Sequence, residues 1–313
     1  MTGQPIIVTG ILPQDVARAL TVSYRVTQVD LQRDGCDTLL AAIGGARAIV
    51  VIPGDPVDGA LIRALPGHVG LIASYSAGLD HVDLAAAKEC GIHVTNTPNV
   101  LTDATADTAI FLLLGAVRGA SQAIPLIQEG RWTGWQPAQI FGSDVTGRIL
   151  GIFGAGRIGV ATASRARAFG MDLVYHSRRA NAKLETLGAR FIGSREEFWG
   201  AADVISLHAP LTSETRHAVN QLSIAKMRDG SFIINTARGD LIDDDAVIAA
   251  LDSGKLAGVG LDVFTGEPQI NPAYLGRPNA LILPHIGSAT HETRAMMGRK
   301  VIESLDQFFV ECG

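Results

Sequence analysis

Short apolar runs alternate with amphipathic segments along the first third of the chain. The apolar runs are rich in Val and Ile, which is typical of buried strands, and the segments between them have helical spacing and end in glycine. The predicted strands are residues 5–10, 24–30, 46–54, 69–78 and 92–98. The predicted helices are residues 14–21, 36–45, 58–67 and 82–91. Strands that alternate with short helices indicate a parallel sheet that is covered on both faces.

A long helical stretch at residues 101–130 contains no strand and separates this series from a second one. The pattern becomes helical again over residues 289–310, and no later strand remains for this last helix to accompany. We therefore predict that the final helix returns to the first series. The chain would then cross between the two series twice, near Pro98 and Pro284. The strands predicted for the second series are residues 150–153, 172–177, 203–208, 231–237, 257–264 and 280–285.

The length of 313 residues exceeds that of one ordinary hydrophobic core, so the two series indicate two domains. The abundance of glycine, 35 residues, suits the many tight strand-to-helix turns of an α/β protein. The predicted fold is α/β with two doubly wound parallel-sheet domains. One domain comprises residues 1–99 together with 286–313, and the other comprises residues 100–285.

The segment GIFGAGRIG contains Gly154, Gly156 and Gly159 in the spacing G-x-G-x-x-G, between a predicted strand and a helical run. In this context the first glycine makes a tight turn, the second lets the backbone approach a pyrophosphate, and the third allows close packing of helix against strand. A glycine-rich turn without a ligand is the alternative. The combination of strand, spacing and helix predicts that residues 100–285 form a Rossmann cofactor domain.

The tip of the next strand distinguishes between the two nicotinamide dinucleotides. An Asp or Glu at this place would accept the ribose hydroxyls of NAD. Residues 175–181, YHSRRAN, contain no carboxylate, whereas Ser177, Arg178 and Arg179 can donate hydrogen bonds to a 2′-phosphate. We predict that NADP is the preferred cofactor and NAD the second one. A solvated basic turn is the alternative.

Three other strands of the second series end close to reactive polar residues, namely Arg238, Glu267 and His285. His285 alone is most simply a core histidine with a satisfied hydrogen bond. Ligands of open α/β sheets, however, bind beyond the carboxyl ends of the strands, where all three residues converge. Reduction of a 2-keto acid needs a hydride donor, a proton donor and a cation for the carboxylate. His285 can donate the proton, Arg238 can bind the carboxylate and keto oxygen, and Glu267 can hold the imidazole.

The sequence resembles the D-isomer-specific 2-hydroxyacid dehydrogenases, and among them the glyoxylate/hydroxypyruvate (2-ketogluconate) reductases. The resemblance covers nearly the whole chain. It rests on residues 74–107, 151–159, 234–251, 260–268 and 283–290.

The resemblance implies that the three reactive residues are catalytic, with Arg238 and His285 also contacting the substrate. It implies that the backbone of Ser76, Ala77 and Gly78 receives the substrate carboxylate. It further implies a homodimer joined through the cofactor domain. For the first domain we expect a flavodoxin-like substrate domain.

Further residues are expected to complete the cofactor site. The resemblance places Asp262 near the nicotinamide amide. His208 follows a strand of the cofactor domain, so it either lines the dinucleotide site or only packs inside the domain. The remaining residues of the predicted site are Arg157, Ile158, Ala209, Pro210, Thr215, Thr236, Ala237 and Gly287.

The predicted function is NAD(P)H-dependent reduction of small 2-keto acids, such as glyoxylate, hydroxypyruvate or 2-ketogluconate, to D-2-hydroxy acids. Formate dehydrogenases of the same family have glutamine in place of the glutamate, so Glu267 argues against that activity. Many phosphoglycerate dehydrogenases of the family carry C-terminal regulatory domains, whereas this chain stops at Gly313. Corepressors of the family keep the same three residues, so a dinucleotide-sensing binding protein with vestigial catalysis is the alternative.

Charge and cysteine usage argue against several other classes of protein. The net charge of −5 does not suit a nucleic-acid surface. Cys36, Cys90 and Cys312 are widely spaced and odd in number, which argues against a disulfide framework or a thiolate zinc site. The histidines show no metal-binding spacing, so we expect no metal. We also expect no membrane span and no signal peptide, and therefore a cytoplasmic protein.

Aromatic residues and histidines outside these motifs leave alternatives open. Trp132 and Trp135 lie in a polar loop and are either partly buried in the core or part of a dimer arm that reaches toward the active site of the partner. His81 and His93 are expected to be surface or packing residues.

Overall fold

The protein is described by a computed structural model that covers residues 3–311, and Cys312 lies outside these residues. The chain forms two compact units. The first contains the chain up to Leu101 and again from Ser288 onward, and the second contains Thr102–Gly287. The chain passes between the units after Leu101 and again after Gly287, three residues beyond Pro98 and Pro284, where the crossings were predicted.

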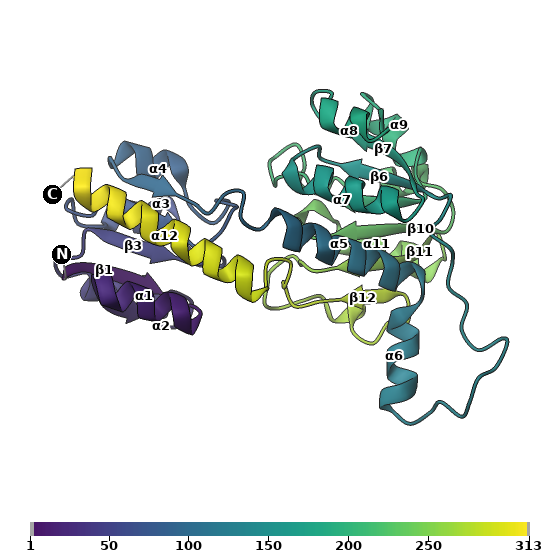
Figure 1. Ribbon diagram of the computed structural model, residues 1–313, viewed down its shortest axis with the longest axis horizontal. Coiled ribbons are helices and arrows are strands. Elements are labelled where there is room, and N and C mark those ends of the chain that lie inside the picture. Colours follow the sequence, from purple (N-terminus) through teal and green to yellow (C-terminus); the bar gives the residue numbers. More distant parts are fainter. Residues whose placement is uncertain (1–2, 312–313) are drawn as a thin grey trace. The chain divides into compact units, whose positions relative to one another are not determined.

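The first unit, which carries both ends of the described chain (Figure 1), is built on a parallel sheet of five strands. The order of its strands is β2-β1-β3-β4-β5. This is the strand order of flavodoxin-like folds. The helix α2 begins five residues before its predicted start, because the Asp30 side chain accepts a hydrogen bond from the Arg33 amide at 3.0 Å. The strands are β1 Gln4–Thr9, β2 Tyr24–Val29, β3 Ala48–Val51, β4 Leu71–Ser74 and β5 His93–Thr95. The helices between them are α1 Gln14–Ser23, α2 Leu31–Ala42, α3 Gly59–Ala64 and α4 Leu84–Glu89.

The final helix, α12 His291–Glu311, packs on the sheet of the first unit, as the pattern predicts. Its buried residues Met297, Val301, Leu305 and Phe308 join the core that includes β1, β3 and β4. These residues follow one another at intervals of three or four, so they lie on one face of the helix.

The second unit contains a parallel sheet of seven strands in the order β12-β11-β10-β9-β6-β7-β8. The order changes direction at β6, and doubly wound sheets bind ligands at such a switch point. The short strand β8 was not predicted, because two residues are too few to give a pattern. The strands are β6 Ile149–Phe153, β7 Asp172–His176, β8 Arg190–Phe191, β9 Val204–Leu207, β10 Ser231–Asn235, β11 Leu256–Leu261 and β12 Ala280–Ile282. The helices between them are α7 Arg157–Ala168, α8 Ala182–Thr186, α9 Arg195–Gly200, α10 Gln221–Lys226 and α11 Asp244–Asp252, with short 3-10 turns at Gly239–Leu241 and Pro272–Tyr274.

Residues 101–130, predicted as one helical stretch, form two helices, α5 Thr102–Val117 and α6 Ala120–Gln128. The two helices are bent by 78°, and Gly119 between them has a left-handed φ of 72°. Among the described residues no single helix is long and apolar enough to cross a membrane, and α5 and α6 reach that limit only as a bent pair. The apolar sequence of α5 is accounted for by its burial in the core of the second unit.

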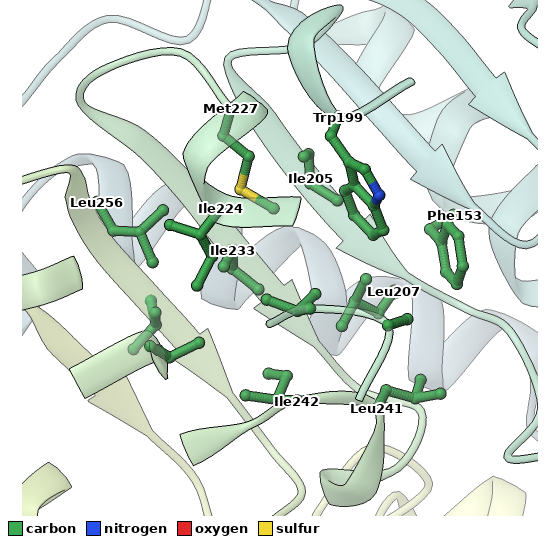
Figure 2. Packing of buried hydrophobic residues seen from close by; sticks show 14 of the residues in the cluster. Phe153, Trp199, Ile205, Leu207, Ile224, Met227, Ile233, Leu241, Ile242 and Leu256 are labelled. Carbon is green, nitrogen blue, oxygen red and sulfur yellow. The ribbon is translucent and has the colours of Figure 1, made fainter. Parts of the chain in front are cut away.

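One face of the seven-stranded sheet buries a dense hydrophobic cluster (Figure 2). Ile205 and Leu207 of β9 and Ile233 of β10 are fully buried in it, together with Trp199 of α9 and Leu241. Because both faces of a parallel sheet are covered, its strands consist of continuous apolar runs. This is the pattern that made these strands recognisable in the sequence.

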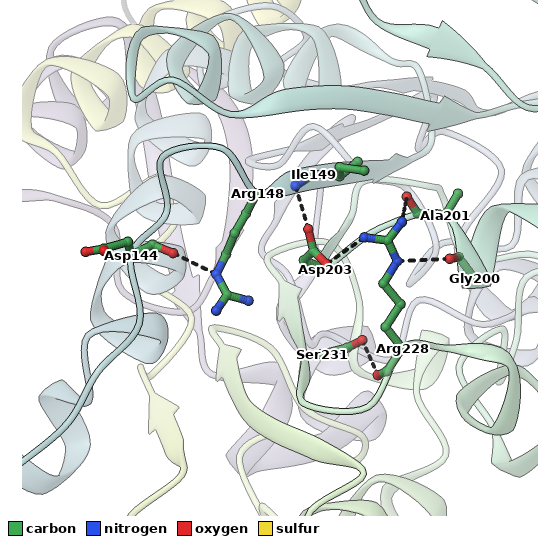
Figure 3. A network of polar contacts seen from close by, with 8 residues as sticks. All are labelled: Asp144, Arg148, Ile149, Gly200, Ala201, Asp203, Arg228 and Ser231. Carbon is green, nitrogen blue, oxygen red and sulfur yellow. Dashed lines mark hydrogen bonds and ion pairs between the residues drawn. The ribbon is translucent and has the colours of Figure 1, made fainter.

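A polar network fixes the N-terminal ends of the central strands (Figure 3). The Asp203 carboxylate accepts hydrogen bonds from the Ile149 amide at 2.8 Å and from the Arg228 guanidinium at 2.7 Å. Arg228 also donates to the Gly200 carbonyl at 3.2 Å. Burial alone would raise the pKa of Asp203, but the two donors outweigh it and lower that pKa. The network ties β6, β9 and β10 together at the end opposite their carboxyl ends.

Candidate active site

The glycine loop joins β6 to α7 and uses each glycine differently. Gly154 has a φ of 107°, and a Cβ atom there would lie 2.5 Å from the Ala209 amide nitrogen. A Cβ on Gly159 would lie 2.3 Å from the Gly154 carbonyl oxygen, so this glycine permits close contact between α7 and the loop. A Cβ on Gly156 would meet nothing within 4 Å. The space beside Gly156, at the N-terminus of α7, is open, which fits the approach of a pyrophosphate.

Two buried polar atoms at the carboxyl ends of β9 and β10, His208 Nδ1 and Thr236 Oγ1, have no hydrogen-bond partner among residues 3–311. His208 Nε2 lies 2.8 Å from Ser206 Oγ. Burial lowers the pKa of His208 to about 3, so the ring is neutral. Its second nitrogen remains able to bond a ligand. These two atoms and the open space beside Gly156 fit a dinucleotide at the predicted ends of the strands.

Other residues of the predicted cofactor site lie around the same strand ends. Arg157 and Ile158 form the first turn of α7. The Thr215 hydroxyl donates to the Pro210 carbonyl at 2.6 Å, which closes the loop after β9.

The turn after β7 carries the residues predicted to bind a 2′-phosphate. Arg178 and Arg179 are exposed, and neither guanidinium bonds another residue in the described part of the chain. The Ser177 hydroxyl donates to the Arg179 carbonyl at 2.6 Å. The Asn181 side chain donates to the Ala155 carbonyl at 2.8 Å, so the turn is attached to the glycine loop.

Arg238, Glu267 and His285 follow β10, β11 and β12, which are neighbouring strands. His285 Nδ1 lies 2.7 Å from Glu267 Oε2, and the other Glu267 oxygen accepts a hydrogen bond from the Phe264 amide at 2.7 Å. Burial alone would raise the pKa of Glu267, but the bond and charge of His285, the Phe264 amide and the charge of Arg238 lower it. The structure therefore brings Glu267 into contact with His285, with Arg238 close enough to act on the carboxylate.

Two residues that sequence reasoning missed hold the backbone around Arg238. Asn235, buried at the end of β10, donates to the Arg238 carbonyl at 2.8 Å and accepts from the Ala237 amide at 3.0 Å. A Cβ on Gly239 would lie 1.9 Å from the Phe264 carbonyl carbon, so this glycine lets the Arg238 loop touch the turn after β11. A buried polar residue at a strand end and a glycine beside a reactive arginine are the signals that could have identified them.

Asp262 holds the backbone that follows His285. The Asp262 side chain is buried, and its two carboxylate oxygens accept hydrogen bonds from the Ile286 and Gly287 amides, each at 2.7 Å. Burial raises the pKa of Asp262. His285 itself has a left-handed φ of 53°, which is uncommon for a residue other than glycine. The structure thus gives Asp262 a contact that was not expected, and its place near the nicotinamide amide stays a prediction.

In the first unit, the carbonyl groups of residues 76–78 all accept hydrogen bonds. The first accepts from the Thr97 amide at 2.7 Å, the second from the Asn96 side chain at 2.7 Å, and the third from the Ser76 hydroxyl at 2.5 Å. In a trans peptide unit the N–H points away from the C=O. Each of the amides of residues 77–79 therefore points away from the carbonyl of its own peptide unit, and none of them donates to another described residue. Successive backbone N–H groups without a partner suit an anion.

Across residues 3–311 we find no group of three or more His, Cys, Asp or Glu side chains that could hold a metal ion. Cys36 and Cys90 are free thiols.

Residues 110–287 match the family described as D-isomer specific 2-hydroxyacid dehydrogenase, NAD binding domain. The chain belongs to this family. The dehydrogenase is 36% identical to glycerate dehydrogenase from Hyphomicrobium methylovorum, over 99% of this chain and 97% of that protein. It is 42% identical to glyoxylate reductase from Thermococcus litoralis, over 86% of this chain and 82% of that protein.

Among solved structures, the dehydrogenase is similar to an NADPH-dependent glyoxylate/hydroxypyruvate reductase from Sinorhizobium meliloti in complex with NADP and malonate. The TM-score is 0.85 at 34% identity, and the match covers 97% of this chain and 93% of that one. These similarities confirm the enzyme class predicted from the sequence, an NAD(P)-dependent D-2-hydroxyacid dehydrogenase.

Proposed function

We propose that this dehydrogenase reduces small 2-keto acids, such as glyoxylate, hydroxypyruvate and 2-ketogluconate, to D-2-hydroxy acids. The observation that carries the proposal is the 2.7 Å contact between His285 and Glu267, with Arg238 acting on the same carboxylate. The relatives named glyoxylate reductase and glycerate dehydrogenase support a substrate of this size. Consumption of NADPH in the presence of glyoxylate or hydroxypyruvate tests it, because a dinucleotide-sensing protein would bind NADPH without oxidising it.

In this proposal His285 is the proton donor. A carboxylate has no proton to give, so the contact with Glu267 places a proton on His285 Nδ1 and leaves Nε2 for the substrate. The lowered pKa of Glu267 keeps its carboxylate ionised in mildly acidic solution, where it stabilises the charged imidazole. When bound, the reduced nicotinamide supplies the hydride for the keto carbon.

The substrate carboxylate and keto oxygen have their own partners in this proposal. The guanidinium of Arg238 is planar and can bind both groups with two parallel donors. The unpaired amides of residues 77–79 can receive the carboxylate as an anion. Binding and proton transfer are therefore assigned to different groups of the chain, which lets them be tested separately.

We also propose that the enzyme prefers NADPH to NADH. Ser177, Arg178 and Arg179 lie in a turn that the Asn181 side chain attaches to the glycine loop. The turn carries donors and no carboxylate, and both guanidinium groups lie at the surface. A carboxylate at this place would repel a 2′-phosphate, whereas two guanidinium groups attract it.

The catalytic efficiency with NADPH should exceed that with NADH by one to two decades, since a few partly exposed charge-assisted bonds contribute on the order of 1.5–3 kcal/mol. The double variant Arg178→Ala, Arg179→Ala should have a higher KM for NADPH, and its KM for NADH should change little. Added salt should reduce the preference. Arg190→Ala, a nearby exposed arginine, is the control. Equal efficiency with both cofactors in the unmodified enzyme would contradict the proposal.

We further propose that two copies of the chain associate through α6 and the loop that follows it. This segment extends away from the sheet of the second unit (Figure 1). It exposes large apolar side chains, which monomeric proteins rarely gather in one place. Trp132 and Trp135 are 52% and 79% exposed, so core burial does not account for them. The other exposed apolar residues of the segment are Ile124, Ile127 and Phe141.

Sedimentation of the purified enzyme at micromolar concentration should give the mass of two chains. The double variant Trp135→Asp, Phe141→Asp should sediment with the mass of one chain, because two charges would then lie in the apolar contact. Leu222→Asp is the matched control, since Leu222 is 77% exposed on α10 of the same unit. If the unmodified enzyme sediments as a single chain, the proposed association of two copies is wrong.

A further inference from the structure

A row of polar side chains lies behind the backbone of residues 76–78. His81 Nε2 lies 3.1 Å from Ser74 Oγ, Ser74 Oγ lies 2.7 Å from Ser76 Oγ, and Ser76 Oγ lies 2.5 Å from the Gly78 carbonyl oxygen. Ser74 and Ser76 are buried. His81, expected from the sequence to be a surface or packing residue, is therefore bonded to the segment that presents the unpaired amides.

Counting hydrogens gives this row a direction. A hydroxyl group has one hydrogen to donate, and a carbonyl oxygen can only accept. The Ser76 hydroxyl gives its hydrogen to the Gly78 carbonyl, so it must accept from Ser74. The Ser74 hydroxyl is then committed to Ser76, so its oxygen must accept from His81. The four groups form one chain of hydrogen bonds that starts at the His81 N–H and ends at the Gly78 carbonyl.

The chain of hydrogen bonds fixes the peptide unit after Gly78. While the Gly78 carbonyl is held by Ser76, the Leu79 amide of the same planar unit must point the other way. Without the His81 N–H, the Ser74 hydroxyl can turn and Ser76 can follow it, so the carbonyl loses its fixed partner. Linked hydrogen bonds strengthen one another, so losing the first weakens the last.

The backbone of His81 is held independently of its ring. The Val57 amide donates to the His81 carbonyl at 3.2 Å, and Val82 pairs with Val57 in a β-bridge. A change of the imidazole therefore removes the first donor and leaves the turn that carries it in place.

We propose that His81 is a positioning residue for substrate binding, which aims the carboxylate-binding amides of residues 77–79 through Ser74 and Ser76. The inference rests on the proposed function, because it takes the bound anion to be the carboxylate of the 2-keto acid. It requires a proton on His81 Nε2 and no contact between His81 and the substrate.

Kinetics with glyoxylate and NADPH test the proposal. His81→Leu and Ser74→Ala should each raise the KM for glyoxylate roughly 3- to 10-fold, the effect of one net hydrogen bond. The kcat and the KM for NADPH should stay within about twofold, because the proposal gives His81 no part in hydride or proton transfer. The double variant should be no worse than either single one, because both changes break the same chain of bonds.

A donor-retaining variant separates positioning from simple packing. His81→Gln keeps an N–H donor at a similar reach, so it should restore the KM to within about twofold of the unmodified enzyme. His93→Leu, an exposed histidine of β5, is the control and should change neither constant. An unchanged KM in His81→Leu would overturn the proposal. A Gln variant as impaired as the Leu variant would also overturn it.

Calorimetric binding of malonate distinguishes this inference from the proposed function. If the unmodified enzyme reduces no keto acid, the proposed function is wrong, yet a roughly 3- to 10-fold weaker Kd for malonate in His81→Leu would still support the role of His81. Malonate affinity that is equal in both proteins would show that His81 does not aim the amides.

Discussion

Replacing His285 with alanine should lower kcat for glyoxylate reduction by about 10²–10⁴-fold, the usual contribution of a positioned proton donor. The substrate still meets its binding groups in this variant, so its KM should change much less. The measurement is steady-state kinetics with NADPH at saturating glyoxylate. The matched control is His68→Ala, because His68 is an exposed histidine. His176 is less suitable, because its ring bonds the Ile192 carbonyl.

The contact between Glu267 and His285 predicts how glyoxylate reduction depends on pH. The pKa of Glu267 is lowered, so its carboxylate is ionised throughout the neutral range and is protonated only below the ordinary range of a glutamate. Glu267→Gln removes that charge, and the protonated imidazole then lacks the carboxylate that stabilises it at 2.7 Å. The alkaline limb of the pH profile for reduction should therefore move to lower pH, so that activity survives only in acid. An alkaline limb that stays in place would contradict the pairing of Glu267 with His285.

Arg238→Ala should abolish measurable turnover, and Arg238→Lys should lose most of it. Lysine keeps the charge but offers a single ammonium group, which cannot bind a carboxylate and a keto oxygen with two parallel bonds. Arg238 also acts on the charge of Glu267, so its loss removes a favourable partner of that carboxylate. The measurement is kcat/KM for glyoxylate with each variant.

The Arg238→Lys variant shows whether the reaction needs only a positive charge at this position or the planar shape of the guanidinium group. Arg131→Lys, a change on an exposed ion pair, is the control and should keep normal efficiency. Near-normal kcat/KM in Arg238→Lys would mean that the planar guanidinium is not needed, and the two-pronged role would be wrong.

The fold was predictable from the sequence where burial alone determines the pattern. Strands covered on both faces are continuous apolar runs, so β9 and β10 could be recognised without knowledge of their partners. The return of α12 could be predicted because no strand follows it. The break between α5 and α6 could not, since a single glycine at position 119 sets a bend that helical spacing does not reveal.

From the sequence we could predict which strand ends meet at the candidate site, but not the contacts that hold its residues. Arg238, Glu267 and His285 follow neighbouring strands, and general rules for parallel sheets bring such ends together. The contacts that hold them depend on tertiary packing. Asp262 bonding the backbone after His285 and Gly239 touching the next turn require coordinates, because neither contact leaves a spacing in the sequence.

Above all, we infer that the enzyme transfers a hydride to the keto group of a small carboxylate substrate. The direct measurement compares NADPH oxidation with glyoxylate and with glyoxal, which has an aldehyde in place of the carboxylate. We expect rapid oxidation with glyoxylate and a kcat/KM for glyoxal lower by several decades, because Arg238 and the amides of residues 77–79 would have no anion to bind. No oxidation with glyoxylate, hydroxypyruvate or 2-ketogluconate, despite measurable NADPH binding, would contradict the proposed reductase activity and favour a dinucleotide-sensing protein.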